Sequence, residues 1–314
     1  MSTGKVVEVL FEQALETFET QDSMLDRVSF FQPDAGSMQN GDNFVWRPVE
    51  QHAPILSGWD LSGQETDIIE ETYPAVLGTP QNDFVKQRAD KMRDMQFWNR
   101  RGIESGRRQS SNLNKGIVNA MRTQGSMYYD SAATSGYEFI ANAQALMNER
   151  QGYHSERCFL LNDRSTLKFS SDLAARQTLQ GRPENDAWTK GQIGSNVAEF
   201  DIYTGSYLPD LVGGASPDTT VTGDQSFKPE GGSVDAVTGV ATNVDYRQAV
   251  IPVAASASYN IGDKVTIGAL TAIGLDDKTN TTQLMTFTIV AKPSATSITV
   301  YPKPIAADDA ALTT

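Results

Sequence analysis

The chain has 314 residues, 39% of them hydrophobic, a single cysteine and a formal net charge of −13. This length suffices for about two or three domains with a sizeable core, and one cysteine excludes an intrachain disulfide. No stretch approaches the roughly 20 apolar residues of a membrane span, and we expect no targeting signal. The acidic balance argues against a protein that wraps nucleic acid, because such proteins neutralise phosphates with lysine and arginine.

The charges are unevenly spread along the chain. Residues 1–80 carry three basic and fourteen acidic side chains, a net charge of −11, whereas residues 81–122 carry ten basic and four acidic ones, a net charge of +6. Opposite charges in adjacent sections can steer one subunit onto another. Two solvated faces that never meet would give the same composition, and composition alone favours that second interpretation.

The first predicted element is an amphipathic helix over residues 5–20, where apolar side chains recur at spacings of three and four between glutamates. The pattern allows a helix that packs on its own domain or one that docks on a neighbour. Residues 44–73 follow as short extended runs separated by prolines and glycines. They predict a long, largely two-stranded excursion with little core of its own.

The middle of the chain is predicted to mix helices and strands. A helix capped by Asn82 or Asp83 runs to about residue 124, and Gly102 and Gly106 weaken its middle by about 1 kcal/mol each, so the pattern allows a break there. A capping box at residues 135–138 starts a second helix. Residues 156–161 are expected to form a buried strand, and residues 197–203 an extended segment.

Beyond residue 213 the composition shifts sharply to Thr, Val, Ala, Gly and Asp. Short alternating segments punctuated by turn residues predict a separate all-β module of about six strands, a barrel or a sandwich. Two long polar loops are expected in it, at residues 229–243 and 274–283. Such loops on a rigid scaffold can make contacts, although solvated loops are the commoner case.

Few residues suit catalysis or metal binding. His52 and His154 are the only histidines, and neither belongs to a metal-binding motif. Ser165 and Lys168 match the S-x-x-K pattern, but the partner motifs of that enzyme class do not follow. We therefore expect no catalytic residue, no metal site and no cofactor.

Several motifs recur in the order and spacing of a known family, over nearly the whole chain. In this order they resemble the coat proteins of short-tailed phages of the lambdoid type. They are Ser37-Met38, Trp46-Arg47-Pro48-Val49-Glu50-Gln51, Gly58-Trp59-Asp60-Leu61, Asn82-Asp83-Phe84, Arg88-Ala89-Asp90, Arg93-Asp94, Arg100-Arg101, Gln225-Ser226-Phe227-Lys228-Pro229, Gly262-Asp263-Lys264, Pro302-Lys303-Pro304-Ile305-Ala306 and Asp308-Asp309.

The resemblance implies an α+β chain with the Hong Kong 97-type major capsid protein fold and an inserted all-β barrel domain. Its segments would be an N-terminal arm at 1–36, an extended loop at 37–80, a peripheral domain with a long helix at 81–130 and the first part of an axial domain at 131–217. The inserted β-barrel domain would occupy 218–305. Residues 306–314 would start a return to the axial domain, whose remainder is missing.

The resemblance also implies a function in self-assembly. The chain would be a major capsid protein of a bacteriophage that forms hexamers and pentamers of an icosahedral shell. Scaffolding and portal proteins would be its partners, and the shell would enclose double-stranded DNA without sequence-specific binding and without a membrane. It would be assembled in the host bacterial cytoplasm. Two alternatives stay open, a nanocompartment shell of the same fold and an acidic hydrolase with an appended β-module.

The candidate contact residues combine this resemblance with the charge pattern. Glu12 stands where the resemblance places an acidic side chain that contacts scaffolding protein, and we expect it on the polar face of its helix, opposite Phe11 and Leu15. The resemblance further suggests that the acidic loop 229–243 bridges neighbouring subunits. Carboxylates of this loop and the nearby Asp245 would meet the basic run of another copy, with the contacts made by Asp235, Asp245, Arg100, Arg101, Arg107 and Arg108.

Overall fold

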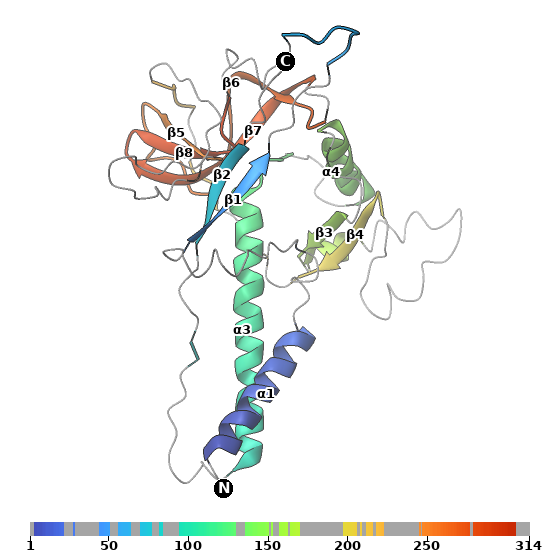
Figure 1. The fold of residues 1–314 in the computed structure, drawn as a ribbon, viewed down its shortest axis with the longest axis vertical. Helices are drawn as coiled ribbons and strands as arrows, with labels where there is room; N and C mark the ends of the chain where they lie inside the picture. Colours follow the sequence, from blue (N-terminus) through green and yellow to red (C-terminus); the bar gives the residue numbers. More distant parts are fainter. Residues whose placement is uncertain are drawn as a thin grey trace, which may run out of the picture. The chain divides into compact units, whose positions relative to one another are not determined.

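The computed structural model describes residues 3–21, 28, 44–50, 56–63, 70–76, 82–83, 94–129, 136–150, 152, 157–162, 164–169, 197–205, 208, 212–215, 218–222, 245, 247–276 and 279–305 (Figure 1). The chain divides into two compact units, Met1–Asp34 with Leu77–Met121 and Ala35–Val76 with Arg122–Thr314. The described part mixes helices and strands, which confirms the α+β expectation. Its elements are α1 (Thr3–Gln21), β1 (Phe44–Glu50), β2 (Glu70–Val76), α3 (Met95–Gln124), α4 (Tyr137–Glu149), β3 (Arg157–Leu161), β4 (Phe200–Thr204), β5 (Ala249–Pro252), β6 (Lys264–Ile273), β7 (Asn280–Ser294) and β8 (Ser297–Tyr301).

In the first unit, α1 packs directly on α3 at two glycines. A Cβ added to Gly102 would lie 2.8 Å from the carbonyl oxygen of Leu10, and one added to Gly106 would lie 2.5 Å from that of Ala14. Both positions must therefore stay without a side chain for the two backbones to approach. The helix is continuous through both glycines, so the break that the sequence allowed is absent, and the contact with α1 offsets their low helix propensity.

The apolar side chains of α1 do not all face α3. Phe11 and Leu15 are 65% and 48% exposed, and Val7 is 65% exposed. The predicted helix is confirmed, but the expectation that Glu12 lies opposite Phe11 and Leu15 is wrong, because all three side chains are exposed on the same side of α1. Periodicity alone could not show that the glycine face of α3 would select a different side of α1 for packing.

The start of α3 lies later than expected. The carboxylate of Asp94 accepts hydrogen bonds from the backbone amides of Gln96 (3.1 Å) and Phe97 (3.3 Å), which is the geometry of an N-cap. Asn82 and Asp83 lie outside helical structure, and residues 84–93 lie outside the described part. The proposed cap at Asn82 or Asp83 is therefore not the cap of α3, whereas the predicted end near residue 124 is confirmed.

In the second unit, α4 packs with the parallel pair β3 and β4 around a small core. That core consists of Ile140, Leu161, Phe169, Phe200 and Ile202. The predicted strand at 156–161 is confirmed to within one residue. The extended segment predicted at 197–203 contains β4, which starts three residues later and ends one residue later. The capping box is wrong, because the N-cap of α4 is Gly136, with no side-chain hydrogen bond at the cap.

The all-β segment forms a four-stranded antiparallel sheet with strand order β5-β8-β7-β6 in the described residues. Its core is centred on Ile251, Phe287, Ile289 and Val300. Strands β6 and β7 are longer than the hydrophobic alternation indicated, so the expected loop 274–283 is a connection of only residues 274–279. The added start of β7, residues 280–284, is mostly polar and alternates between exposed and half-buried positions, which explains why hydrophobic alternation did not mark it. Loop 229–243 lies outside the described residues.

The Gly-Asp-Lys motif at 262–264 joins several segments of the second unit. The Asp263 carboxylate accepts hydrogen bonds from the backbone amides of Gly214 (3.1 Å) and Asn260 (2.7 Å). Gly214 has to be a glycine here, because an added Cβ would lie 2.1 Å from the carbonyl oxygen of Ser258. The motif therefore holds the segment around Gly214 against the start of β6.

Lys264 completes the C-terminus of α3. Its ammonium group donates to the carbonyl oxygens of Arg122 (3.3 Å) and Gly125 (2.9 Å) and contacts the Thr288 hydroxyl at 2.6 Å. A cation is favourable at a helix C-terminus, because the last carbonyls have no partner inside the helix. Burial lowers the pKa of Lys264 from its ordinary value.

The end of α4 contacts the same strand pair through Arg150, which is buried. Its guanidinium donates to the carbonyl oxygen of Leu284 (3.2 Å) and contacts the sulfur of Met285 (3.1 Å). Its own carbonyl oxygen accepts from the amide of Leu275 (3.3 Å). Both helix ends in this unit therefore finish on β6 and β7 or on the turn between them.

Strands β1 and β2 pair antiparallel from Phe44↔Val76 to Glu50↔Glu70 with no register shift. This confirms the predicted two-stranded excursion. In the described residues the second strand spans Glu70–Val76, so it extends three residues beyond the predicted range of 44–73 and includes Pro74.

The packing of α1 on α3 predicts opposite effects for two glycine substitutions. Gly106→Ala forces a methyl group into the α1 backbone and should cost about 1–3 kcal/mol, seen as faster amide hydrogen exchange throughout α1. Gly116 is the matched control, because nothing lies within 4 Å of an added Cβ. Gly116→Ala should leave α1 exchange unchanged and raise helix stability by about 0.5–1 kcal/mol. Equal exchange in both variants would contradict the packing.

Candidate assembly surfaces

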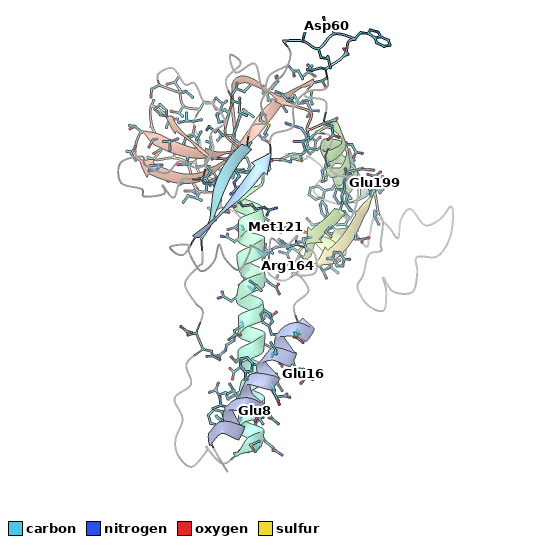
Figure 2. All side chains as sticks on the ribbon, viewed as in Figure 1. Glu8, Glu16, Asp60, Met121, Arg164 and Glu199 are labelled. Carbon is cyan, nitrogen blue, oxygen red and sulfur yellow. The ribbon has the colours of Figure 1, made fainter. Side chains whose placement is uncertain are left out.

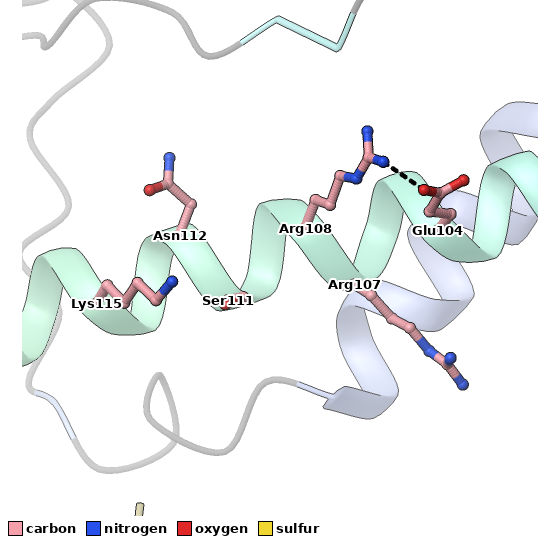
Figure 3. Close-up of a pocket in the computed structure, with 6 residues that line it drawn as sticks. All are labelled: Glu104, Arg107, Arg108, Ser111, Asn112 and Lys115. Atoms are coloured by element: carbon pink, nitrogen blue, oxygen red, sulfur yellow. Dashed lines mark hydrogen bonds and ion pairs between the residues drawn. The ribbon is translucent and has the colours of Figure 1, made fainter. Parts of the chain in front are cut away.

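All four predicted arginines lie on α3, on the part of the helix that carries a net charge of +4 between residues 100 and 115. The four arginines differ in whether they already form ion pairs within their own subunit. Arg101 donates to Glu104 at 2.6 Å, and Arg108 pairs with the other oxygen of the same carboxylate (Figure 3). Arg108 also lies 3.9 Å from the Asp83 carboxylate. One glutamate thus neutralises part of the charge of two arginines.

Arg107 and Lys115 are the least engaged cations of this basic face. Both are exposed, and neither forms an ion pair or a hydrogen bond with the residues that the structure describes. They line a shallow depression together with Glu104, Arg108, Ser111 and Asn112 (Figure 3). Because their charges are uncompensated within the described subunit, they are the cations most available to a partner.

The outer side of α1 combines acidic and apolar side chains. Glu12 is exposed, as predicted for a contact residue, and it shares this side with Glu8, Glu16 and Glu19 (Glu8 and Glu16 are labelled in Figure 2). The exposed Val7, Phe11 and Leu15 are spaced four residues apart and form a neighbouring apolar row. This surface can accept a partner with basic and apolar side chains.

Asp245 is already held by its own subunit. Its carboxylate accepts two hydrogen bonds from the Arg247 guanidinium, at 3.0 and 2.7 Å, and one from the Gln248 amide at 3.2 Å. The Arg247 guanidinium also stacks over the Tyr301 ring, 5.6 Å from its centroid. Contact with a neighbouring arginine would have to compete with this pair. Asp235 lies outside the described residues.

A third surface was not singled out as a contact from the sequence. Trp59 is fully exposed, with Leu56 and Leu61 nearby in the chain at 43% and 44%. The turn that carries it is held by the Asp60 carboxylate, which accepts from the Ser62 hydroxyl (2.7 Å) and the Ser62 amide (3.1 Å). These bonds lower the pKa of Asp60 (labelled in Figure 2). The signal in the sequence was a tryptophan between a glycine and an aspartate, in a segment without core periodicity.

The described residues offer little for catalysis. They contain no group of three or more His, Cys, Asp or Glu side chains placed to hold a metal ion. Ser165 and Lys168 lie in a helical turn at residues 164–169, while His52 and His154 lie outside the described part. In the helices that the structure describes, none combines the length and apolar character needed to cross a bilayer.

The family of this chain is identified by a match to a known protein family. The model of the family described as P22 coat protein, gene protein 5, matches residues 1–314. The chain belongs to the P22 coat protein family. It is a major capsid protein that forms the shell of a short-tailed phage of the lambdoid type, its place is the virion capsid, and it is not an enzyme. The family implies a capsid fold and excludes the hydrolase alternative.

For a coat protein, the exposed Trp59 is expected to be an anchor of assembly. Buried aromatic side chains dominate interfaces, and their truncation commonly costs about 2 kcal/mol or more. Trp59→Ala should leave the melting of the free subunit unchanged, because the side chain contacts little there, and should sharply reduce the yield of closed particles. Leu167→Ala, at a position 71% exposed, is the control. Equal particle yields from both variants would remove Trp59 from the assembly contacts.

Proposed function

We propose that this coat protein has the Hong Kong 97-type arrangement, with residues 218–305 as an inserted β-barrel and with hexamers and pentamers as its capsomers. The four-stranded sheet with a core of its own supports the inserted module. The proposed segments 1–36, 37–80, 81–130, 131–217 and 306–314 complete the arrangement. The shell would enclose double-stranded DNA without gripping it, which suits a chain with a net charge of −13.

The observation that carries the proposed contact between subunits is the basic face of α3. Arg107 is exposed and without an ionic partner in the described part, while Arg101 and Arg108 share Glu104. We propose that carboxylates of loop 229–243 of an adjacent subunit, with Asp235 and nearby Asp245, meet this face at Arg100, Arg101, Arg107 or Arg108. Asp235 would bind the arginines more readily than Asp245, because Asp245 has to break its hydrogen bond with Arg247 before it can bind another subunit.

Such contacts act through repetition. An exposed ion pair contributes roughly 0 to 1 kcal/mol, so one pair cannot hold a shell together. Symmetry repeats the same pair at equivalent interfaces, and each repeat strengthens the same closed assembly.

Neutralising the acidic partners tests this contact. Asp235→Asn with Asp245→Asn should change the stability of the free subunit only through the lost Arg247 pair, and it should shift assembly from closed particles toward tubes or free subunits in electron micrographs. Asp245→Asn alone separates the two effects, because it removes the internal pair and leaves Asp235. Raising salt to about 1 M, where the Debye length is roughly 3 Å, should weaken assembly of the unaltered chain in the same direction. Normal particles from the double variant at low and high salt would rule the contact out.

We further propose that α1 binds scaffolding protein during assembly through Glu12, and that a portal protein occupies one vertex of the shell. The packing of α1 on α3 leaves the Glu12 side free for such a partner, so internal packing and scaffold binding do not compete for the same side of the helix.

Charge reversal at this position separates binding from folding. Glu12→Lys should abolish or misdirect scaffold-dependent assembly while the subunit keeps its helicity and melting, because Glu12 has no hydrogen-bond partner in the described part. Glu138→Lys, at an exposed position of α4, is the control. The proposal is wrong if Glu12→Lys cosediments with scaffolding protein and forms particles as well as the control does.

A further inference from the structure

The β1–β2 ribbon has a proline near the middle of each strand. Pro48 pairs with Thr72, and Pro74 pairs with Trp46, within a ladder that has no register shift. In an antiparallel ladder, hydrogen-bonded and non-hydrogen-bonded pairs alternate. The two proline pairs are two residues apart and thus of the same kind. Since proline has no N–H to donate, an unbroken ladder requires both to be non-hydrogen-bonded pairs.

In a non-hydrogen-bonded pair, the amide positions of both residues point away from the partner strand. The N–H missing at Pro48 is therefore missing from the outer edge of β1, and the one missing at Pro74 from the outer edge of β2. In the described part of the chain the ribbon has no third strand, so these are its two open edges. Each is interrupted near its centre.

Proline also takes an outward position in β5, the end strand of the four-stranded sheet, where residues 220–222 cover part of the edge through the antiparallel bridge Val221↔Val253. The carbonyl oxygen of Pro252 accepts from the amide of Thr222 (3.0 Å), which lies outside that sheet. The backbone polar groups of Pro252 therefore face the outer edge of β5, as those of Pro48 and Pro74 face the edges of the ribbon. Three strands at the ends of their sheets thus carry proline at an outward position.

An open strand edge is a template for another chain, and proline is one of the residues that blocks it. A coat protein is exposed to this hazard more than most proteins, because shell assembly brings many identical ribbons together. We propose that Pro48 and Pro74 determine the specificity of self-assembly by closing both ribbon edges to strand addition by a second copy. Copies then join through side-chain contacts of helices, loops and strand faces.

Restoring the amides tests the proposal in the full chain. Pro48→Val with Pro74→Val supplies an N–H to each edge, and valine favours strand structure, so the subunit should keep its circular dichroism spectrum. Sedimentation velocity should show open-ended oligomers that bind thioflavin T, at least tenfold faster in onset than with the unaltered chain, and fewer closed particles. The single variant Pro48→Val opens only one ribbon edge, so its oligomerisation should stop at the dimer.

A rescue variant distinguishes edge protection from ribbon stability. Adding Glu50→Pro and Thr72→Pro to the double variant returns one proline to an outward position of each strand, two residues from the original. This variant should recover the monomer content and particle yield of the unaltered chain. The proposal is overturned if the double variant stays monomeric and assembles normally, or if the rescue variant aggregates as fast as the double variant.

Discussion

The first unit depends on one face of α3 that carries only uncharged residues and has glycine where α1 approaches most closely. Gly102, Gly106, Ser110, Asn114 and Val118 recur every four residues and are all buried. At the two glycines the backbone of α1 comes so close that a methyl group could not be inserted. Small residues on this face leave the charged residues to other faces of α3, where Arg107 and Lys115 remain exposed. One helix thus serves packing within the subunit and carries the surface proposed for contact between subunits.

In the second unit, the comparable constraint is the completion of two helix ends. The last carbonyls of α3 are bound by Lys264, and the residue that ends α4, Arg150, reaches the backbone of Leu284. Unpaired carbonyls at a helix end cost free energy when they are removed from water. Strands β6 and β7 therefore contribute to the helices as well as to their own sheet. The Gly-Asp-Lys motif gains a physical explanation, because Asp263 fixes the incoming chain and Lys264 the helix end.

The sequence predicted the positions of helices and strands better than it predicted which side of each helix is buried. Periodicity located α1 and the end of α3, and the charge run located the arginines. Periodicity could not predict which apolar residues of α1 would face α3, because Leu10, Phe11, Ala14 and Leu15 all fit the same helical pattern. The glycines of α3 determine which of them lie in the contact. The start of α3 was misplaced because Asn82, Asp83 and Asp94 are all good caps by type. Trp59 belongs to a motif of the family resemblance, but its residue type alone does not predict that it is exposed and available for a contact.

The central claim is that α3 packs on its own subunit through its glycine face and meets another copy through its basic face. An electron cryomicroscopy reconstruction of closed particles, with side chains visible, tests it most directly. We expect α1 of the same subunit against Gly102 and Gly106, and carboxylate oxygens of a different copy within about 4 Å of Arg107 or its neighbours, the range of an ion pair. A shell in which the basic face of α3 meets only solvent or nucleic acid phosphates would contradict it.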